Sequence, residues 1–281
     1  MSRSLSFGRR AKNSLFYLFS VFTTLFALFF LGAIFWELIR SGFAGLDWSD
    51  FTENTPPPMT DGGFLNALVG SLIMTSIAMS LATVVGVLVA TFLSEFRKQA
   101  RLGSVVRFLN DILLSAPSII IGLFIYALLV VPFGGFSGIA GAIALAIVAL
   151  PMITRTCEDV LRIVPDQLRE AGIALGLKRS TVTLRIIYRS ARAGMVTAVL
   201  LALGRVAGET APLLFTALNN SGFSANLFAP MPNLPVMIYQ FAMSPYENWK
   251  ELAWAASLLI TVFILALNVF SRVIFRPSTS S

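Results

Sequence analysis

Two charged residues, Arg205 and Glu209, stand inside the otherwise apolar run GRVAGETAP at residues 204–212. Arginine presents a planar fork of N–H donors that suits the oxygens of an oxyanion. On a helix, a glutamate four residues later lies on the same face as the arginine. In a membrane, each charge costs about 2.5 to 3.5 kcal/mol at the bilayer centre. We therefore expect both side chains to face protein or water, with Arg205 interacting with an anion and Glu209 acting as its partner or gate.

The residues around this pair indicate a packed and interrupted helix. Gly204 and Gly208 form a small-xxx-small pair that lets a neighbouring helix approach, and Pro212 removes the backbone hydrogen bond to the carbonyl of Gly208. Two interpretations stay open: an ion pair that only locks the helices together, or residues beside a translocation pathway. Ionisable residues inside membranes are functional by default, which favours the pathway.

The composition places these residues in a polytopic membrane protein. Of 281 residues, 56% are hydrophobic and only 12% are charged, with a mean hydropathy of +0.80, whereas soluble chains are about one quarter charged. A bilayer crossing needs roughly 20 apolar helical residues. Runs of this length lie near 15–36, 64–94, 112–131, 136–154 and 252–271, with a sixth at 193–217 if its charges are tolerated. We predict an all-α fold of six transmembrane helices. The first is expected to be a retained anchor, because it is long and lacks a favourable cleavage site.

The basic residues are distributed unevenly among the connections. Nearly all of the 21 Lys and Arg lie in the N-terminal tail, at 97–107, at 155–192 and in the C-terminal tail, while the other connections hold only Arg40 and Lys250. By the positive-inside rule, both termini are expected in the cytoplasm. Contact with anionic lipid accounts for the net charge of +7, and no pattern of a nucleic-acid reader occurs. We therefore expect membrane lipid, and not nucleic acid, as a partner.

The residue types exclude most enzyme chemistry. Cys157 is the single cysteine and the chain has no histidine, so it can form neither a disulfide, nor a Cys/His metal site, nor a His-based triad. The phosphate-binding spacing G-x-x-x-x-G-K-[ST] does not occur either. The acids Glu158 and Asp159 have arginines at helical spacing, which indicates a solvated ion-pair cluster. We expect no catalytic, metal-binding or cofactor-binding residue, and nucleotide would have to bind a partner.

The long basic connection before the fifth span has helix signals of its own. Pro165 and Asp166 suit a first helical turn and Gly176 suits a stop, which predicts a short helix over 165–175. One face of this helix would carry small and apolar residues, namely Leu168, Ala171, Gly172 and Leu175. Such a face suits a groove of another protein. Ser180 is expected to cap a second helix that runs into the fifth span. A basic helix on the membrane surface is the alternative for this second helix.

The same connection carries a pattern that resembles the EAA loop of ABC importer permeases. Glu170-Ala171-Gly172 is followed by Gly176 and, ten residues later, by Ile186. Gly172 stands where the family has alanine, and Tyr188-Arg189 stands where it usually has Leu-Pro. The resemblance implies that this loop docks in a cleft of an ATP-binding subunit and carries its closing motion into the membrane. It assigns that coupling role to Glu170, Ala171, Gly172 and Gly176.

A second and more specific resemblance starts at the charged pair. The segments GRVAGETAPLLFTAL (204–218), NLPVMIYQFAMSP (233–245) and ELAWAASLLI (251–260) resemble the PstA-type permease subunits of bacterial phosphate-specific ABC importers. The resemblance implies the type I, MetI-like permease fold and import of inorganic phosphate across the bacterial cytoplasmic (inner) membrane. It also implies a heterodimer with a PstC-type permease, two PstB-type ATP-binding subunits at the cytoplasmic loops, and an external PstS-type phosphate-binding protein.

These observations divide the chain into three parts. Residues 1–63 hold the N-terminal tail, the first span and an acidic, proline-containing outer loop; residues 64–275 hold the permease core, with its EAA loop at 160–192; residues 276–281 form a tail. We expect a non-catalytic permease subunit of an ATP-driven phosphate importer. The alternatives are a permease for another oxyanion, such as phosphonate or sulfate, or an ion-coupled carrier or channel, against which the EAA-like loop argues.

Overall fold

The computed structural model describes residues 7–95 and 100–274, and every regular element in these two ranges is a helix. Five helices of the described ranges are long and apolar enough to cross a membrane, and a bent pair makes six if it forms one crossing. The long helices are α1 (Phe7–Ala44), α2 (Leu65–Glu95), α6 (Gly138–Ile163), α9 (Tyr188–Val206) and α12 (Glu247–Ile274). The all-α membrane fold expected from the sequence is confirmed. The expected tail at 276–281 lies outside the described residues.

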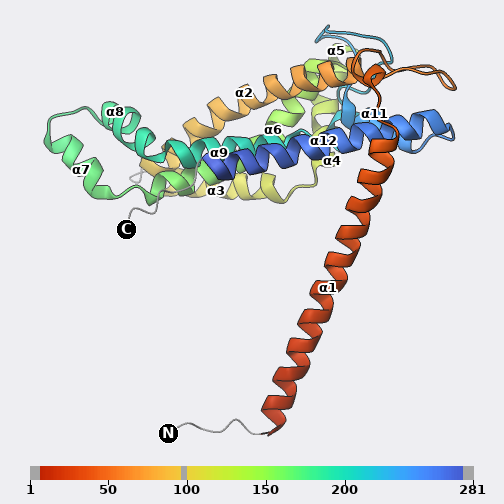
Figure 1. Cartoon of the computed structure of the whole chain (residues 1–281). Helices are drawn as coiled ribbons and strands as arrows, with labels where there is room; N and C mark the ends of the chain where they lie inside the picture. The colour runs from red at the N-terminus through yellow and green to blue at the C-terminus, as the bar shows by residue number, and fades with distance from the viewer. Residues whose placement is uncertain (1–6, 96–99, 275–281) are drawn as a thin grey trace.

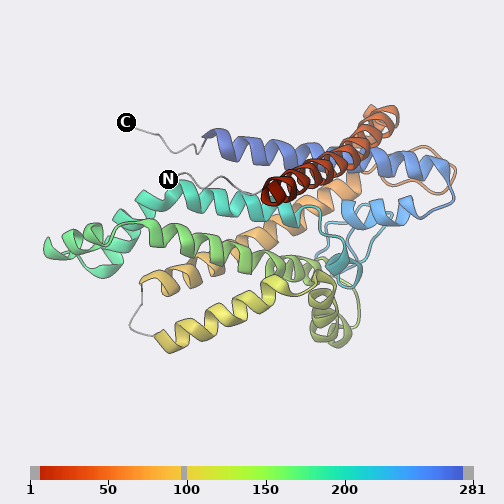
Figure 2. The ribbon, with the colours of Figure 1, turned by 90° about the horizontal axis from the view of Figure 1, so that it is seen from below.

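The third apolar run, expected as one helix over 112–131, is broken instead. Its elements are α3 (Ala100–Ser115), α4 (Ser118–Ile125), the π-helix η2 (Tyr126–Val130) and α5 (Val131–Phe133). The two halves meet at an angle of 103° on either side of Pro117, so that α3 runs along the bundle and α4 leaves the direction of α3 (Figure 2). Proline carries no N–H and keeps the residue before it out of the helical region. The apolar run at 112–131 therefore lies in a bent helix pair, and its sequence did not predict this bend.

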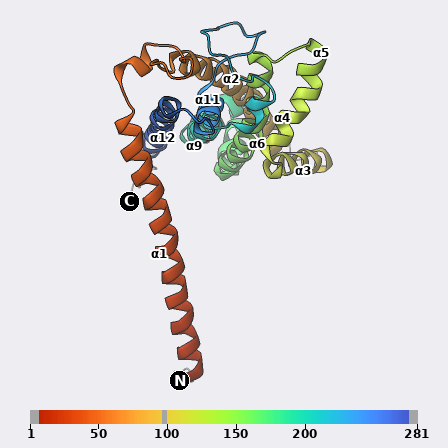
Figure 3. The ribbon, with the colours of Figure 1, turned by 90° about the vertical axis from the view of Figure 1, so that its right-hand side faces the viewer.

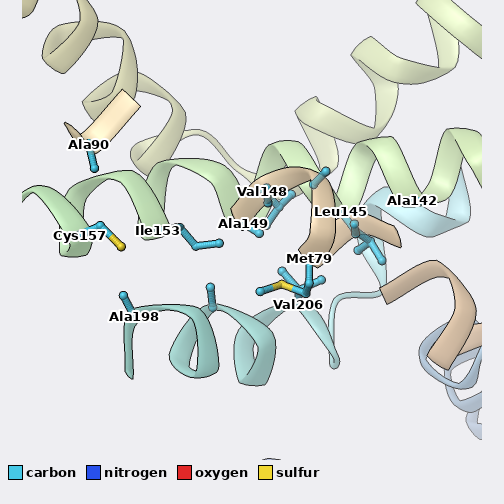
Figure 4. Close-up of a cluster of buried hydrophobic side chains, with 14 of the residues drawn as sticks. Met79, Ala90, Ala142, Leu145, Val148, Ala149, Ile153, Cys157, Ala198 and Val206 are labelled. Atoms are coloured by element: carbon cyan, nitrogen blue, oxygen red, sulfur yellow. The ribbon is translucent and has the colours of Figure 1, made fainter. Parts of the chain in front are cut away.

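α6 is the central helix of the bundle. Of the residues in its apolar stretch, 67% are buried inside the chain, against 0% for α1. α2 and α9 pack along α6, and α3 and α4 also contact it (Figure 1). The contacts are close: a Cβ at Gly86 of α2 would lie 2.9 Å from Cγ2 of Ile153. Figure 4 shows part of the buried apolar cluster that results, with side chains from α2, α6 and α9 that include Met79, Ile153 and Ala198.

α1 leaves the other helices at a steep angle (Figures 1 and 3). Near its C-terminal end it packs on α12, where a Cβ at Gly42 would lie 2.7 Å from Cβ of Leu258. At Gly45, a Cβ would lie 2.9 Å from the carbonyl oxygen of Glu251, so two glycines permit this contact. The apolar side chains earlier in α1 are exposed on all sides. A helix that is apolar all round is typical of a membrane span.

The connection after α6 forms the part of the molecule that extends beyond the other helices at one end (Figure 1). Its elements are α7 (Asp166–Ala174), α8 (Arg179–Val182) and the π-helix η3 (Thr183–Ile187). The helix expected over 165–175 is confirmed as α7. Ser180, the expected cap, already lies inside α8, and Lys178 holds the N-cap position with no side-chain cap bond. α8 and η3 run directly into α9, so the fifth span begins within this connection. We call this region the α7–α8 end.

Two connections, residues 45–64 and 207–233, cover the opposite end of the bundle. The first connection contains the short helix η1 (Trp48–Phe51) and the second contains α10 (Ala211–Leu214). The second connection leads into α11 (Leu234–Ala242). Asn66 joins the two connections and is only 1% exposed. Its amide nitrogen donates to the carbonyl oxygen of Asn220 at 3.2 Å, and its Oδ1 accepts from the hydroxyl of Thr55 at 2.8 Å. The second connection, which contains Glu209, is therefore anchored to α2.

Replacement of Gly70 by alanine is expected to destabilise the fold. Gly70 lies in α2, where a Cβ would collide with the carbonyl oxygen of Pro232, and this backbone atom moves only if the whole connection shifts. Overpacking of this kind costs about 1 to 3 kcal/mol. We expect Gly70→Ala to lower the thermal unfolding temperature of the detergent-purified protein. Gly32→Ala in α1 is the control, because nothing lies within 4 Å of its new Cβ; equal unfolding temperatures for the two variants would contradict the close contact.

Candidate functional site

The structure brings Arg205 and Glu209 together, although only Arg205 lies in a helix and Glu209 follows the end of that helix. Arg205 lies in the last turn of α9, which ends at Val206, and Glu209 lies in the connection that follows. Nε of Arg205 is 3.7 Å from Oε1 of Glu209, which is too long for a hydrogen bond. The side chain of Arg205 is 43% exposed and that of Glu209 17%. The two residues therefore form a loose ion pair, and the arginine keeps donors that no bond within the pair uses.

Gly204, Gly208 and Pro212 are the residues expected to pack and interrupt this segment, and the two glycines make looser contacts than the proline. Gly204 and Gly208 both lie against α12, but a Cβ on either would be 3.6 or 3.7 Å from Ile264, which is ordinary van der Waals distance. The backbones therefore approach less closely here than the glycine pair suggests. Pro212 lies at the start of α10, so it begins a new helix and does not kink α9. It makes the tight contact of this site, since a Cβ at Gly122 of α4 would lie 2.7 Å from its Cα.

A largely apolar cavity of about 340 Å³ lies beside the charged turn, between α2, α9, α11 and α12. Leu203 of α9 and Ala207, the first residue after α9, stand on either side of Arg205 in the sequence and line the cavity. The α2 wall also contributes hydroxyl groups, those of Ser71, Thr75 and Ser76. Ile264 lies near the middle of α12, so its contact with the turn places the turn part-way along the length of the bundle. The ion pair therefore lies next to an open, largely apolar pocket, which its neighbours Leu203 and Ala207 line.

The EAA-like residues take two different positions on α7. Glu170 and Ala171 are exposed, whereas Gly172 is buried. A Cβ at Gly172 would lie 2.8 Å from Cγ2 of Val182, so α7 packs on α8 through this residue. That contact accounts for glycine where the family has alanine. Of the predicted small and apolar face, Gly172 is therefore turned toward α8, and the others remain exposed, namely Leu168, Ala171 and Leu175.

Gly176 ends α7 in a left-handed conformation, with φ of +80°. Its N–H donates to the carbonyl of Ile173 at 2.9 Å, and the N–H of Leu177 donates to the carbonyl of Gly172 at 3.2 Å. This pair of bonds is a Schellman motif, which satisfies the last carbonyls of a helix and favours glycine at the left-handed position. Gly176 therefore sets the turn between α7 and α8, as its place in the sequence predicts.

A buried ion cluster, centred on Glu158 of α6, lies at the α7–α8 end. The side chain of Glu158 is 3% exposed, and its Oε1 accepts from Nε of Arg107 and Nη2 of Arg162, both at 2.7 Å. Arg107 comes from α3 and also donates to the carbonyl of Leu93 in α2 at 3.0 Å. The expectation of a solvated cluster is therefore wrong for Glu158. Sequence reasoning missed Arg107, because it lies 51 residues from Glu158 and no local spacing pairs them.

Asp159, the next residue in the sequence, is solvated as expected. Its side chain is 56% exposed, and its Oδ2 lies 3.5 Å from Nε of Arg155. Among the residues that the structure describes, no group of three or more His, Cys, Asp and Glu is arranged to hold a metal ion. Glu158 and Asp159 therefore form ion pairs, two of them within α6 and one, Arg107–Glu158, between α3 and α6.

Comparisons with known proteins identify the family. A family model described as "Binding-protein-dependent transport system inner membrane component" matches residues 82–277. The phosphate transport system permease protein PstA of Pasteurella multocida (strain Pm70) is 48% identical over 275 residues, 98% of each chain. The chain belongs to the PstA family of phosphate transport permeases. A more distant PstA-family member is PstA 1 of Mycobacterium tuberculosis (strain H37Rv), 32% identical over 278 residues, which cover 97% of this chain and 90% of the relative.

Solved structures show the fold that this PstA-family chain shares. A chain of the inward-facing MetNI methionine ABC transporter matches with a TM-score of 0.62 at 21% identity, over 75% of this permease and 93% of that chain. A chain of a bacterial alginate ABC transporter, solved in complex with an alginate-bound periplasmic protein, matches with a TM-score of 0.68 at 13% identity. This match covers 98% of the permease and 99% of the alginate transporter chain. At these identities the likeness shows the fold alone. The permease therefore has the MetI-like fold of type I ABC importers.

Removal of the Glu158 carboxylate is expected to destabilise the permease strongly. Glu158→Ala removes a buried carboxylate that accepts from two arginines, which are themselves 31% and 47% exposed, and the loss of hydrogen bonds to a charged group costs about 1.5 to 3 kcal/mol. Asp159→Ala removes an exposed carboxylate from the same helix turn, which costs about 1 kcal/mol or less. Thermal unfolding of both detergent-purified variants beside the wild type tests the difference. If Glu158→Ala unfolds no earlier than Asp159→Ala, the cluster contributes nothing to the stability of this end.

Proposed function

We propose that the chain is the membrane permease subunit of an ATP-driven importer of inorganic phosphate. The observation that carries the proposal is its near full-length similarity to permeases named for phosphate transport, at 48% identity for the Pasteurella multocida protein. The subunit is non-catalytic, and ATP is hydrolysed by a separate subunit. It resides in the bacterial cytoplasmic (inner) membrane with both termini in the cytoplasm. The gathering of basic residues at the α7–α8 end supports this orientation.

Phosphate passes the turn that holds Arg205 and Glu209. The turn lies part-way along the bundle beside a largely apolar pocket, and the Arg205 side chain is 43% exposed and loosely held. Such a group offers paired donors to an oxyanion without first breaking a strong bond. Glu209 holds the arginine in the absence of the anion and repels a second negative charge. The chemistry is electrostatic and reversible, as transport requires.

The α7–α8 end carries the contact with the ATPase. Glu170 and Ala171 are exposed on a short helix that extends beyond the bundle, while Gly172 and Gly176 set the shape of the loop from inside. A short helix of this kind suits a groove in a partner. The assembly comprises a PstC-type permease that completes the pathway, two PstB-type ATP-binding subunits on the cytoplasmic loops, and a PstS-type phosphate-binding protein outside.

Arg205→Ala is expected to reduce ATP-dependent phosphate uptake about tenfold or more, because a charge-assisted hydrogen bond contributes about 1.5 to 3 kcal/mol. Uptake of radiolabelled phosphate is measured in vesicles that hold the assembled importer and is scaled to the amount of subunit in the membrane. Arg40→Ala, which removes an exposed arginine of α1, is the matched control. Competition by sulfate or a phosphonate in the same assay tests the other oxyanions, which should not displace phosphate.

The double variant Arg205→Ala/Glu209→Gln separates a pathway residue from a purely structural ion pair. If the pair only stabilises the fold, removal of both charges restores the uptake that Arg205→Ala loses. If Arg205 contacts the anion, the double variant stays as defective as the single one. Normal phosphate uptake by the Arg205→Ala variant, at a normal amount of subunit in the membrane, would rule out the pathway role of Arg205.

Glu170→Arg is expected to release the ATP-binding subunits while the permease stays folded in the membrane. The exposed carboxylate is replaced by a charge of opposite sign on the proposed docking face, and an unpaired like charge at an interface costs several kcal/mol. Co-purification of the ATPase with the tagged permease measures the effect. Asp159→Arg makes the same charge change at an exposed site on the same end and should leave co-purification unchanged. Full ATPase recovery with Glu170→Arg would count against docking at this face.

A further inference from the structure

We propose that Arg169 is the positioning residue that joins the ATPase-coupling helix α7 to α2 and α6, so that movement of α7 moves both membrane helices. This inference rests on the proposed function, because it assumes that the ATPase acts on α7. Arg169 precedes the exposed Glu170 in the sequence, and it points the other way, into the protein: its side chain is only 14% exposed.

The first connection runs from Arg169 to Glu95 in the last turn of α2. Nε of Arg169 donates to Oε1 and Oε2 of Glu95 at 3.1 and 3.2 Å, and Nη2 donates to Oε1 at 2.8 Å. The Glu95 side chain is also 14% exposed. Two-pronged arginine–carboxylate contacts fix the relative orientation of both groups, and burial keeps water from screening the attraction. The end of α2 is therefore held in one position against α7.

The second connection runs from the same guanidinium to the end of α6. Nη2 donates to the carbonyl of Leu161 at 2.8 Å, and Nη1 donates to the carbonyl of Val164. These carbonyls belong to the last residues of α6, where no further helical N–H is available to pair with them. Nη1 also donates to Oδ1 of Asp166, at the start of α7, at 3.2 Å. One planar group thus joins three helix ends.

The surroundings make this side chain the direct route from α7 to α2. A cavity of about 440 Å³ opens between α2, α7, α8 and η3, with Leu88 and Thr91 on the α2 side and Ile173 on the α7 side. Loose packing transmits displacement poorly, because bulky groups can move into the empty space, whereas a bonded contact cannot yield in that way. The Arg169–Glu95 contact closes one edge of this cavity and bridges the two helices.

The chemistry predicts which substitutions break the link. Lysine keeps the positive charge but has no planar fork, so it does not reach a carboxylate and two carbonyls at once. Glu95→Gln keeps the size of the side chain and one acceptor oxygen but loses the charge. Without the link, the ATPase still docks on the exposed face of α7 and still hydrolyses ATP. The movement of α7 is then absorbed at the cavity and is not passed to α2.

The test is the number of phosphate ions imported per ATP hydrolysed by the complete importer in vesicles, with the external binding protein supplied. The variants are Arg169→Ala, Arg169→Lys, Glu95→Gln and Arg169→Ala/Glu95→Gln. We expect each single variant to lower this ratio about fivefold or more, with ATPase co-purification at the wild-type level. The double variant should be no worse than the single ones. Arg155→Ala and Asp159→Ala, which break an exposed ion pair at the same end, should leave the ratio unchanged.

Each result decides the matter. An unchanged ratio in Arg169→Ala or Glu95→Gln overturns the inference, and so does a parallel loss of assembly, ATP hydrolysis and import, which would mark Arg169 as merely structural. If Arg169→Ala fails to accumulate, the milder Glu95→Gln decides alone. A wild-type ratio of phosphate imported per ATP in the Arg169→Lys variant also contradicts the inference. If the wild-type assembly itself imports no phosphate with ATP, the proposed function fails, and that outcome is distinct from any change among the variants.

Discussion

The structure depends on one constraint: hydrocarbon offers polar groups no partner, and it drives helices together only through close packing. α6 meets this constraint for the helices around it, with 67% of its apolar stretch buried while α2, α3, α4 and α9 contact it. Small residues make the approach possible, as at Gly86 against Ile153. The helices that carry the charged turn and the α7–α8 end are both positioned by their contacts with this centre. α1 has no such support along most of its length.

The same constraint produces two kinds of charged site. At the α7–α8 end, Glu158 and Arg169 are largely buried, and each makes several short hydrogen bonds. Part-way along the bundle, Arg205 and Glu209 stay 3.7 Å apart, and the arginine is 43% exposed. A fully bonded buried group holds elements together, whereas a loosely held one remains available to a ligand. The permease therefore has well-bonded polar contacts at one end and a loosely bonded polar turn part-way along the bundle.

The fold of this molecule does not by itself indicate the substrate. The MetI-like fold is shared with chains of transporters named for methionine and for alginate, at 21% and 13% identity. A fold that serves such different compounds does not itself specify one of them. The similarity to phosphate permeases covers 98% of the chain and includes the charged turn at 204–212, which lies beside an open, largely apolar pocket. The substrate proposal thus rests on this turn and on the relatives, and the assembly proposal rests on the α7–α8 end.

The sequence by itself determined the features that depend on neighbouring residues. Long apolar runs predicted the membrane helices, Pro165 and Gly176 bounded α7, and the signature residues indicated the family, because helix ends and spans follow local rules. Only the tertiary structure decided the 103° bend at Pro117, the burial of Glu158 against Arg107, and the bond from Arg169 to Glu95. The last pair is 74 residues apart in the chain. Such contacts depend on how whole helices pack, and no local pattern encodes which distant side chain will satisfy a buried charge.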